Sequence, residues 1–152
     1  MEKNIAYDAE LKVNNWVKVI KVNEQGDTIS LNIGDNSLIK NLVTLINDIQ
    51  NIGKELNEAE KKFGEDYEEE EFMRKLDFLN LKMAETSEKI DSFFGFDTCM
   101  KVFRTNTPYI DDVMDFLFQI SDLIEKFTGE KVANLENIKK KFTDRQKNRR
   151  KI

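Results

Sequence analysis

Asp111, Asp112 and Asp115 are the side chains of this sequence that are best placed to do chemistry. Residues four apart share one face of a helix, so Asp111 and Asp115 could hold Mg²⁺ or Ca²⁺ together. The same acids also stand in the first turns of an expected helix, where the helix dipole stabilises negative charge. We favour this structural role, and we predict no metal ion and no other cofactor.

The other residue types argue against catalysis. The sequence has no histidine, which excludes an imidazole base, a His-based triad and a Cys/His zinc site. Cys99 is the only cysteine, and its apolar neighbours in the sequence predict a small buried side chain rather than a reactive thiol. No GxxxxGK[ST] loop for a phosphate occurs. We therefore predict that the protein is not an enzyme and has no catalytic residues.

Two apolar ladders with a heptad step run through the middle of the chain. Their spacings alternate between four and three residues, in the first through Leu38, Leu42, Leu45, Ile49, Ile52, Leu56, Ala59 and Phe63, and in the second through Phe72, Leu76, Leu79, Met83, Thr86, Ile90 and Phe93. Such a step keeps one narrow stripe of a helix facing a partner. We predict an antiparallel helical hairpin of residues 37–63 and 67–94. Pairing within one chain and pairing between chains both fit, so a homo-oligomer is left open.

Capping signals place the ends of the expected helices. Residues 34–37 are expected to stop a strand and cap the first helix, Asp66 to cap the second and Gly95 to end it. Thr107 as N-cap, with Pro108 at the first helical position, predicts a third helix at 108–128. A weaker apolar pattern predicts a fourth helix at 131–142.

The first third of the chain has the composition of β structure. Residues 28–33 alternate between polar and apolar types, and residues 23–27 have the chemistry of a five-residue turn, so we predict a β-hairpin at about 11–33. Apolar residues on both faces of the first strand indicate a bulge near Val19-Ile20 or burial on both sides. A lone hairpin is marginal in water, and we expect Trp16 to anchor it on the helices.

The whole pattern predicts one mainly helical α+β domain at 1–138, followed by a basic segment at 139–152. Eight lysines and arginines against one acid give that segment a charge of +7, which leaves −12 for the rest of a chain of net charge −5. It lacks interleaved aromatics and a recognition fold, so nucleic-acid binding is disfavoured. The cations also suit a helix C-terminus or the acidic body of the same or a neighbouring subunit.

Three observations bear on the compartment. No apolar run approaches the roughly 18 residues that a membrane span needs. The first residues lack the features of a secretory signal, and one cysteine cannot form an internal disulfide. The sequence predicts a cytosolic protein without membrane contact.

Residues 90–103, read as IDSFFGFDTCMKVF, carry a resemblance to a known family. This acidic and aromatic helix end, followed by FG, two residues, T and a later K-x-F, resembles small tail assembly chaperone-like proteins of phages and prophages of Gram-positive bacteria. Residues 33–36 after a β segment and the basic residues 144–150 are also similar to that family. Two positions depart from its pattern: Phe96-Asp97 replaces a glycine-containing pair, and Arg104 stands where glycine is common.

The resemblance implies a non-enzymatic role in the host bacterial cytoplasm, in which the chain binds the tape measure protein or tail tube subunits during tail assembly. It implies that the partner contacts Phe93, Phe94, Gly95, Thr98, Cys99 and Phe103, and that Arg145, Asn148, Arg149 and Arg150 make further contacts. The heptad stripes and several methionines independently favour a helical client. Two alternatives stay open: a structural subunit of a tail or tail-like particle, and a small nucleic-acid-binding regulator.

Overall fold

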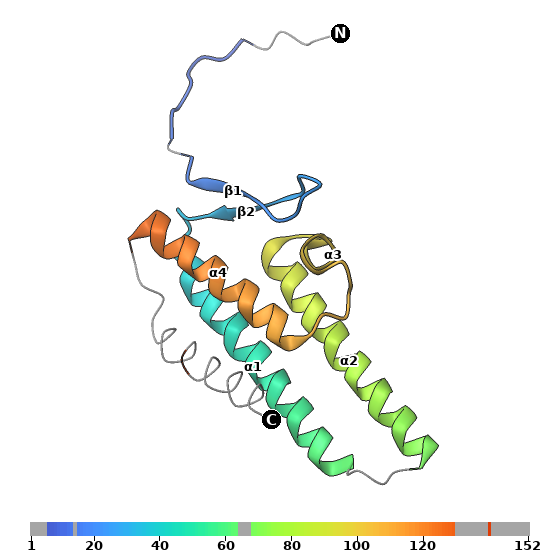
Figure 1. Cartoon of the computed structure of the whole chain (residues 1–152). Helices are drawn as coiled ribbons and strands as arrows, with labels where there is room; N and C mark the ends of the chain where they lie inside the picture. The colour runs from blue at the N-terminus through green and yellow to red at the C-terminus, as the bar shows by residue number, and fades with distance from the viewer. Residues whose placement is uncertain (1–5, 14, 64–67, 130–139, 141–152) are drawn as a thin grey trace, which may run out of the picture.

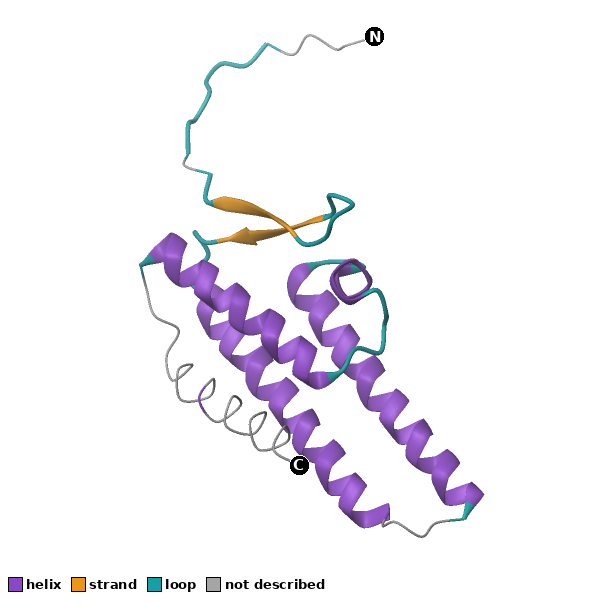
Figure 2. Ribbon diagram, viewed as in Figure 1, coloured by secondary structure: helices purple, strands orange, loops and turns teal. Residues whose placement is uncertain are grey.

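The computed structural model describes residues 6–13, 15–63, 68–129 and 140. In these residues a two-stranded antiparallel hairpin precedes four helices, which confirms the predicted α+β layout (Figures 1 and 2). The elements are β1 (Val17–Lys21), β2 (Thr28–Asn32), α1 (Leu38–Phe63), α2 (Glu69–Phe94), α3 (Thr98–Phe103) and α4 (Ile110–Thr128). The predicted helix at 131–142 and the basic segment at 139–152, with Arg145, Asn148, Arg149 and Arg150, lie outside the described residues except for residue 140.

The two long helices form an antiparallel pair within one chain. Ion pairs join Lys82 to Glu55 and, at 3.6 Å, the Lys89 Nζ to an Asp48 carboxylate oxygen. From the first pair to the second, the position on α2 advances by seven residues while the position on α1 retreats by seven, as an antiparallel alignment requires. The hydrogen bond from Lys82 to Glu55 raises the pKa of Lys82, although burial opposes it. The helical hairpin predicted from the ladders is thus confirmed.

The core lies where α4 crosses the part of the helical hairpin nearest the β-hairpin (Figure 1). Its buried apolar residues come mainly from the first ladder and from α4: Leu42, Leu45, Ile49, Ile52, Val113, Met114, Leu117, Ile120 and Ile124. The polar rung Thr86 is fully buried, and its hydroxyl donates to the Lys82 carbonyl at 2.9 Å. Gly53 on α1 faces α4, since a Cβ added there would lie 3.5 Å from Ile110 Cγ2.

The β-hairpin differs from the prediction in two respects. The ladder is regular from Val17 opposite Asn32 to Lys21 opposite Thr28, so the predicted bulge is absent. Ile20 packs against the core while Val19 on the other face is 66% exposed, so only one face of β1 is buried. The strand also begins at Val17 rather than near residue 11, and the pairing before it is limited to the bond from the Ile33 amide to the Trp16 carbonyl among the described residues. The turn at 23–27 forms as predicted, with Asn23 bonded to Asp27.

Two predicted helix starts are also displaced. α4 begins at Ile110, because the Thr107 hydroxyl is bonded to Thr105 and not to the helix, while Tyr109 holds an extended backbone conformation. α2 begins at Glu69 instead of 67, and its predicted cap Asp66 lies outside the described residues. The segment predicted to cap the first helix instead forms a turn before it, in which the Asp35 carboxylate accepts from the Ser37 amide at 2.9 Å and from its hydroxyl at 2.6 Å. These bonds lower the pKa of Asp35.

Candidate protein-binding grooves

The segment between α2 and α3 is held by a compact set of hydrogen bonds. Gly95 ends α2 as predicted: its φ is +117°, and its amide donates to the Asp91 carbonyl at 2.8 Å. The Asp91 carboxylate accepts from the Cys99 amide at 2.9 Å, and the Thr98 hydroxyl donates to the Gly95 carbonyl at 2.7 Å. Three residues of the quoted motif, Asp91, Gly95 and Thr98, therefore fix the angle between α2 and α3.

Asp97 and Arg104 hold the left-handed backbone conformation, with φ of 64° and 63°. They are the only residues other than glycine with positive φ in the described parts of the chain. Asp97 precedes α3, and Arg104 ends it by donating its amide to the Met100 carbonyl at 3.0 Å. Glycine adopts this conformation without the steric cost of about 1–2 kcal/mol that other residues carry. In the family pattern that residues 90–103 resemble, a glycine-containing pair stands at positions 96–97 and glycine is common at position 104.

Three of the six predicted partner-contacting residues lie inside the protein. Phe94, Thr98 and Cys99 are buried, and the Phe94 ring contacts Phe116 with centroids 5.2 Å apart. Phe93 and Phe103 are half-buried, whereas Gly95 is exposed. The Phe103 ring also packs edge-on against Phe116, at 5.6 Å between centroids. The motif therefore builds a junction between α2, α3 and α4. Among the six predicted contact residues, Phe93 and Phe103 are the apolar ones that remain partly accessible.

Cys99 is a buried thiol with the character expected from the sequence. Its side chain has no exposed surface, and burial raises its pKa, although a hydrogen bond with Ser87 acts in the opposite direction. A protonated, inaccessible thiol is a poor nucleophile. Cys99 thus contributes to packing beneath the α2–α3 junction.

A larger groove, here called the α2 groove, lies between α2 and the loop that leads into α4. It has a volume of about 700 Å³ and is lined by Leu76, Leu79, Asn80, Met83, Phe103, Thr105, Thr107, Pro108, Tyr109 and Asp112. The three apolar residues from α2 are spaced by three and four residues and are only half-buried. Tyr109 stands at the rim with 76% of its surface exposed. This part of the second ladder therefore stays accessible from the groove and is not fully covered by α1.

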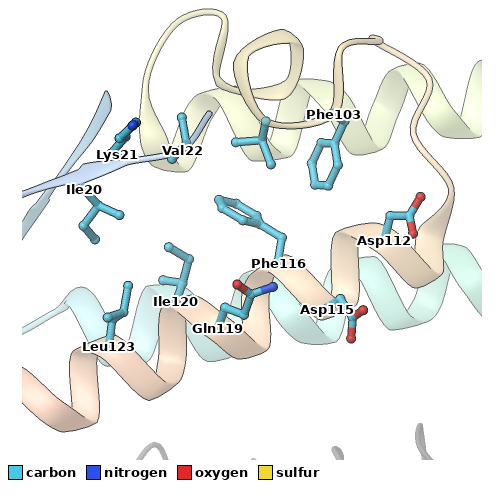
Figure 3. Close-up of a pocket in the computed structure, with 11 residues that line it drawn as sticks. Ile20, Lys21, Val22, Phe103, Asp112, Asp115, Phe116, Gln119, Ile120 and Leu123 are labelled. Atoms are coloured by element: carbon cyan, nitrogen blue, oxygen red, sulfur yellow. The ribbon is translucent and has the colours of Figure 1, made fainter. Parts of the chain in front are cut away.

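A second groove, here called the hairpin groove, lies between β1, α3 and α4 (Figure 3). It has a volume of about 370 Å³, with Phe116 and Ile120 among its apolar lining residues. Asp112, Asp115 and Gln119 lie along its α4 side, and Lys21 comes from β1 (Figure 3). Phe103 and Asp112 line both grooves, which therefore adjoin along one surface.

The carboxylates that the sequence offered for a metal lie beside these grooves. In the parts of the chain that the structure describes, no three acidic or thiol side chains are grouped so that they could hold a metal ion, and this includes Asp111, Asp112 and Asp115. Asp112 and Asp115 instead add negative charge to a mostly apolar surface. Among the described helices, none is both long and apolar enough to span a membrane.

Sequence reasoning missed the groove-lining role of the loop at 105–109 and the exposure of Phe96, which is 90% exposed in the α2–α3 turn. The proline at 108 marked a helix start in the sequence, but nothing there showed that the loop would stand beside α2.

Comparison of the chain with protein-family models, with curated proteins and with solved structures found no match.

Proposed function

We propose that this chain is a non-enzymatic protein that binds an amphipathic helix of a client protein in the α2 groove. The observation that supports this most is the half-buried row of Leu76, Leu79 and Met83, which lines a mostly apolar groove. Groove-binding helices present apolar side chains at the same intervals of three and four residues. Methionine adapts its shape to different partners, so Met83 suits such a surface.

The size and charge of the groove define the client further. An α-helix about 10 Å wide rises about 5.4 Å per turn, so one turn occupies roughly 420 Å³. A groove of about 700 Å³ therefore matches the volume of between one and two turns of a helix. Glu68, Glu69, Glu70 and Glu71 are exposed one to two turns before Leu76, and Asp112 lines the opposite side. The client is an apolar-faced helix with basic flanking residues.

The resemblance of residues 90–103 supports a role for this activity in phage tail assembly. We propose a tail assembly chaperone of the host bacterial cytoplasm, with the tape measure protein as its client and the tail tube subunit as a further partner. The left-handed conformations of Asp97 and Arg104 favour this proposal, because they keep a turn geometry suited to the glycines of the family pattern. The predicted contact residues then act mainly by building the junction, and Phe103 contacts the client directly.

Two substitutions on α2 test the groove. Leu79→Lys places a charge in it, and Leu81→Lys is the matched control, because Leu81 is 65% exposed and is not among the residues that line the groove. Each variant is co-purified with helical segments of the tape measure protein, and binding is measured by calorimetry. We expect roughly 30-fold weaker binding for Leu79→Lys, in the range of an interface hot spot, and no change for Leu81→Lys.

A second variant separates loss of binding from loss of folding. Tyr109→Ala removes an exposed ring at the rim and, like tyrosine, offers α4 no capping side chain, so it leaves the thermal unfolding midpoint unchanged and still weakens client binding. Equal binding by all three variants would overturn the groove proposal. If the chain is instead found in purified particles at fixed stoichiometry, the structural-subunit alternative replaces the chaperone.

A further inference from the structure

The segment before β1 has the pattern of a strand but no partner strand. In residues 7–13 the apolar Tyr7, Ala9, Leu11 and Val13 alternate with Asp8, Glu10 and Lys12. This period of two is the signature of a strand with one apolar face. The segment, here called the arm, extends away from the body of the molecule (Figure 1). Leu11 is 90% exposed, and Tyr7 and Val13 are nearly as open.

β1 has an open edge that fits such a strand. The Ile33 amide donates to the Trp16 carbonyl and the Val22 amide to the Asp27 carbonyl, so the even-numbered residues of this strand direct their backbone groups toward β2. The backbone groups of Val19 and Lys21 therefore point to the opposite edge. Among the described residues nothing pairs with that edge, because the sheet has two strands only. Unpaired edges of this kind readily accept another strand.

A local bond opposes the tightest return of the arm onto β1 of its own chain. A two-residue turn at 14–15 would need both backbone groups of Trp16 to face the arm, but its carbonyl accepts from Ile33 on the other side. The tightest route back therefore conflicts with a bond that the folded protein makes.

We propose that the arm pairs antiparallel with the open edge of β1 in a second copy of this chain, and that the exchange is mutual. Residues 7–13 of each copy then lie along residues 15–21 of the other, which joins the two hairpins into one continuous sheet. Leu11 stands opposite Val17 and Ala9 opposite Val19, so the apolar row of the arm meets the exposed apolar row of β1. This arrangement is independent of client binding in the α2 groove.

Charge and apolar contact together select the register of this pairing. With Leu11 opposite Val17, Glu10 stands opposite Lys18, and opposite charges directly across two strands stabilise the pair. A shift by two residues that places Leu11 opposite Val19 would bring Lys12 opposite Lys18, and like charges there are unfavourable. A shift by two residues in the other direction would bring Asp8 opposite Lys18 but would leave Leu11 opposite the polar Asn15. The first register therefore keeps both the ion pair and the contact between Leu11 and Val17.

Engineered disulfides test the proposal in the full-length chain. The variants are made in a Cys99→Ser background. The test variant combines Leu11→Cys with Val17→Cys. The matched control combines Lys12→Cys with Val17→Cys, because residue 12 would project from the opposite face of the sheet. We expect oxidation to give a covalent dimer for the first pair and not for the second. An internally bridged monomer, equal dimer from both pairs, or no disulfide would each overturn the proposal.

Charge exchange gives a second test, and its first substitution, Glu10→Lys, leaves folding intact because the arm makes no contact with the described core. Sedimentation equilibrium is expected to show dimerisation about fivefold weaker for Glu10→Lys, which places like charges opposite each other, with recovery when Lys18→Glu is added. Two results would contradict exchange of the arms. One is a wild-type chain that remains monomeric when its concentration is raised 100-fold above the lowest concentration that can be detected. The other is a double variant that dimerises no more strongly than Glu10→Lys alone.

Discussion

Replacement of Arg104 by glycine and by alanine tests the left-handed turn that ends α3. Both substitutions remove the exposed hydrogen bond from the Arg104 guanidinium to Gln25, so that loss cancels when the two variants are compared. Alanine retains a steric cost of about 1–2 kcal/mol at a φ of 63°. Glycine removes it but adds about 0.5–1 kcal/mol of backbone entropy in the unfolded chain. We therefore expect the glycine variant to be the more stable by about 1 kcal/mol.

Ser92 provides the matched control, because it is exposed and lies within α2. Inside a helix the order of stability of the two variants reverses, so the alanine variant at position 92 is expected to be more stable than the glycine variant by about 1 kcal/mol. Urea unfolding followed by circular dichroism measures all four variants, and an unchanged slope shows that the unfolded state is comparable. If alanine at position 104 is as stable as glycine, the backbone conformation assigned to this turn is wrong.

Three shorter predictions follow from the packing. Cys99 is expected to react with an aromatic disulfide reagent at pH 8 at least about 100-fold more slowly in the native protein than in urea, because the thiol is buried and its pKa is raised; a fast native reaction would contradict this burial. Gly53→Ala should stabilise the protein by about 1 kcal/mol in thermal unfolding, since the added Cβ meets Ile110 at an ordinary 3.5 Å; a loss would mean that α1 and α4 lie closer than described. Gly34→Ala places a Cβ within 2.8–3.0 Å of three Trp16 atoms, so it should cost about 1–3 kcal/mol and shift the fluorescence of the single tryptophan; unchanged emission would place Trp16 elsewhere.

The ladders predicted the helical hairpin because a heptad step specifies both the helix and the face that it buries. Periodicity does not specify how far along the helix a partner covers that face. Ile90 is fully buried in the core, whereas Leu76 and Leu79 of the same ladder line an open groove. Which part of a stripe is left open depends on where α4 lies, and that is decided by contacts between residues distant in sequence.

The β-hairpin shows the same limit on a smaller scale. Residue types alone could not rank the two apolar faces of β1, since Val19 and Ile20 are equally suited to a strand. The helices cover the face that carries Ile20, and Val19 is left exposed. The candidate site was located in part: the motif at 90–103 forms one side of the junction, but the loop at 105–109 supplies the rim of the groove through Tyr109. No local pattern predicted that loop's position.

Site-specific photocrosslinking tests the binding of a client helix in the α2 groove most directly. A benzophenone side chain replaces Tyr109 at the groove rim or, in the matched control, exposed Leu81 on the same molecule. Each protein is irradiated together with the tape measure protein, and the crosslinked peptides are mapped by mass spectrometry. We predict crosslinks from position 109 to one apolar-faced helical segment and none from position 81. Crosslinks from both positions in equal yield, or from neither, would contradict the proposed groove.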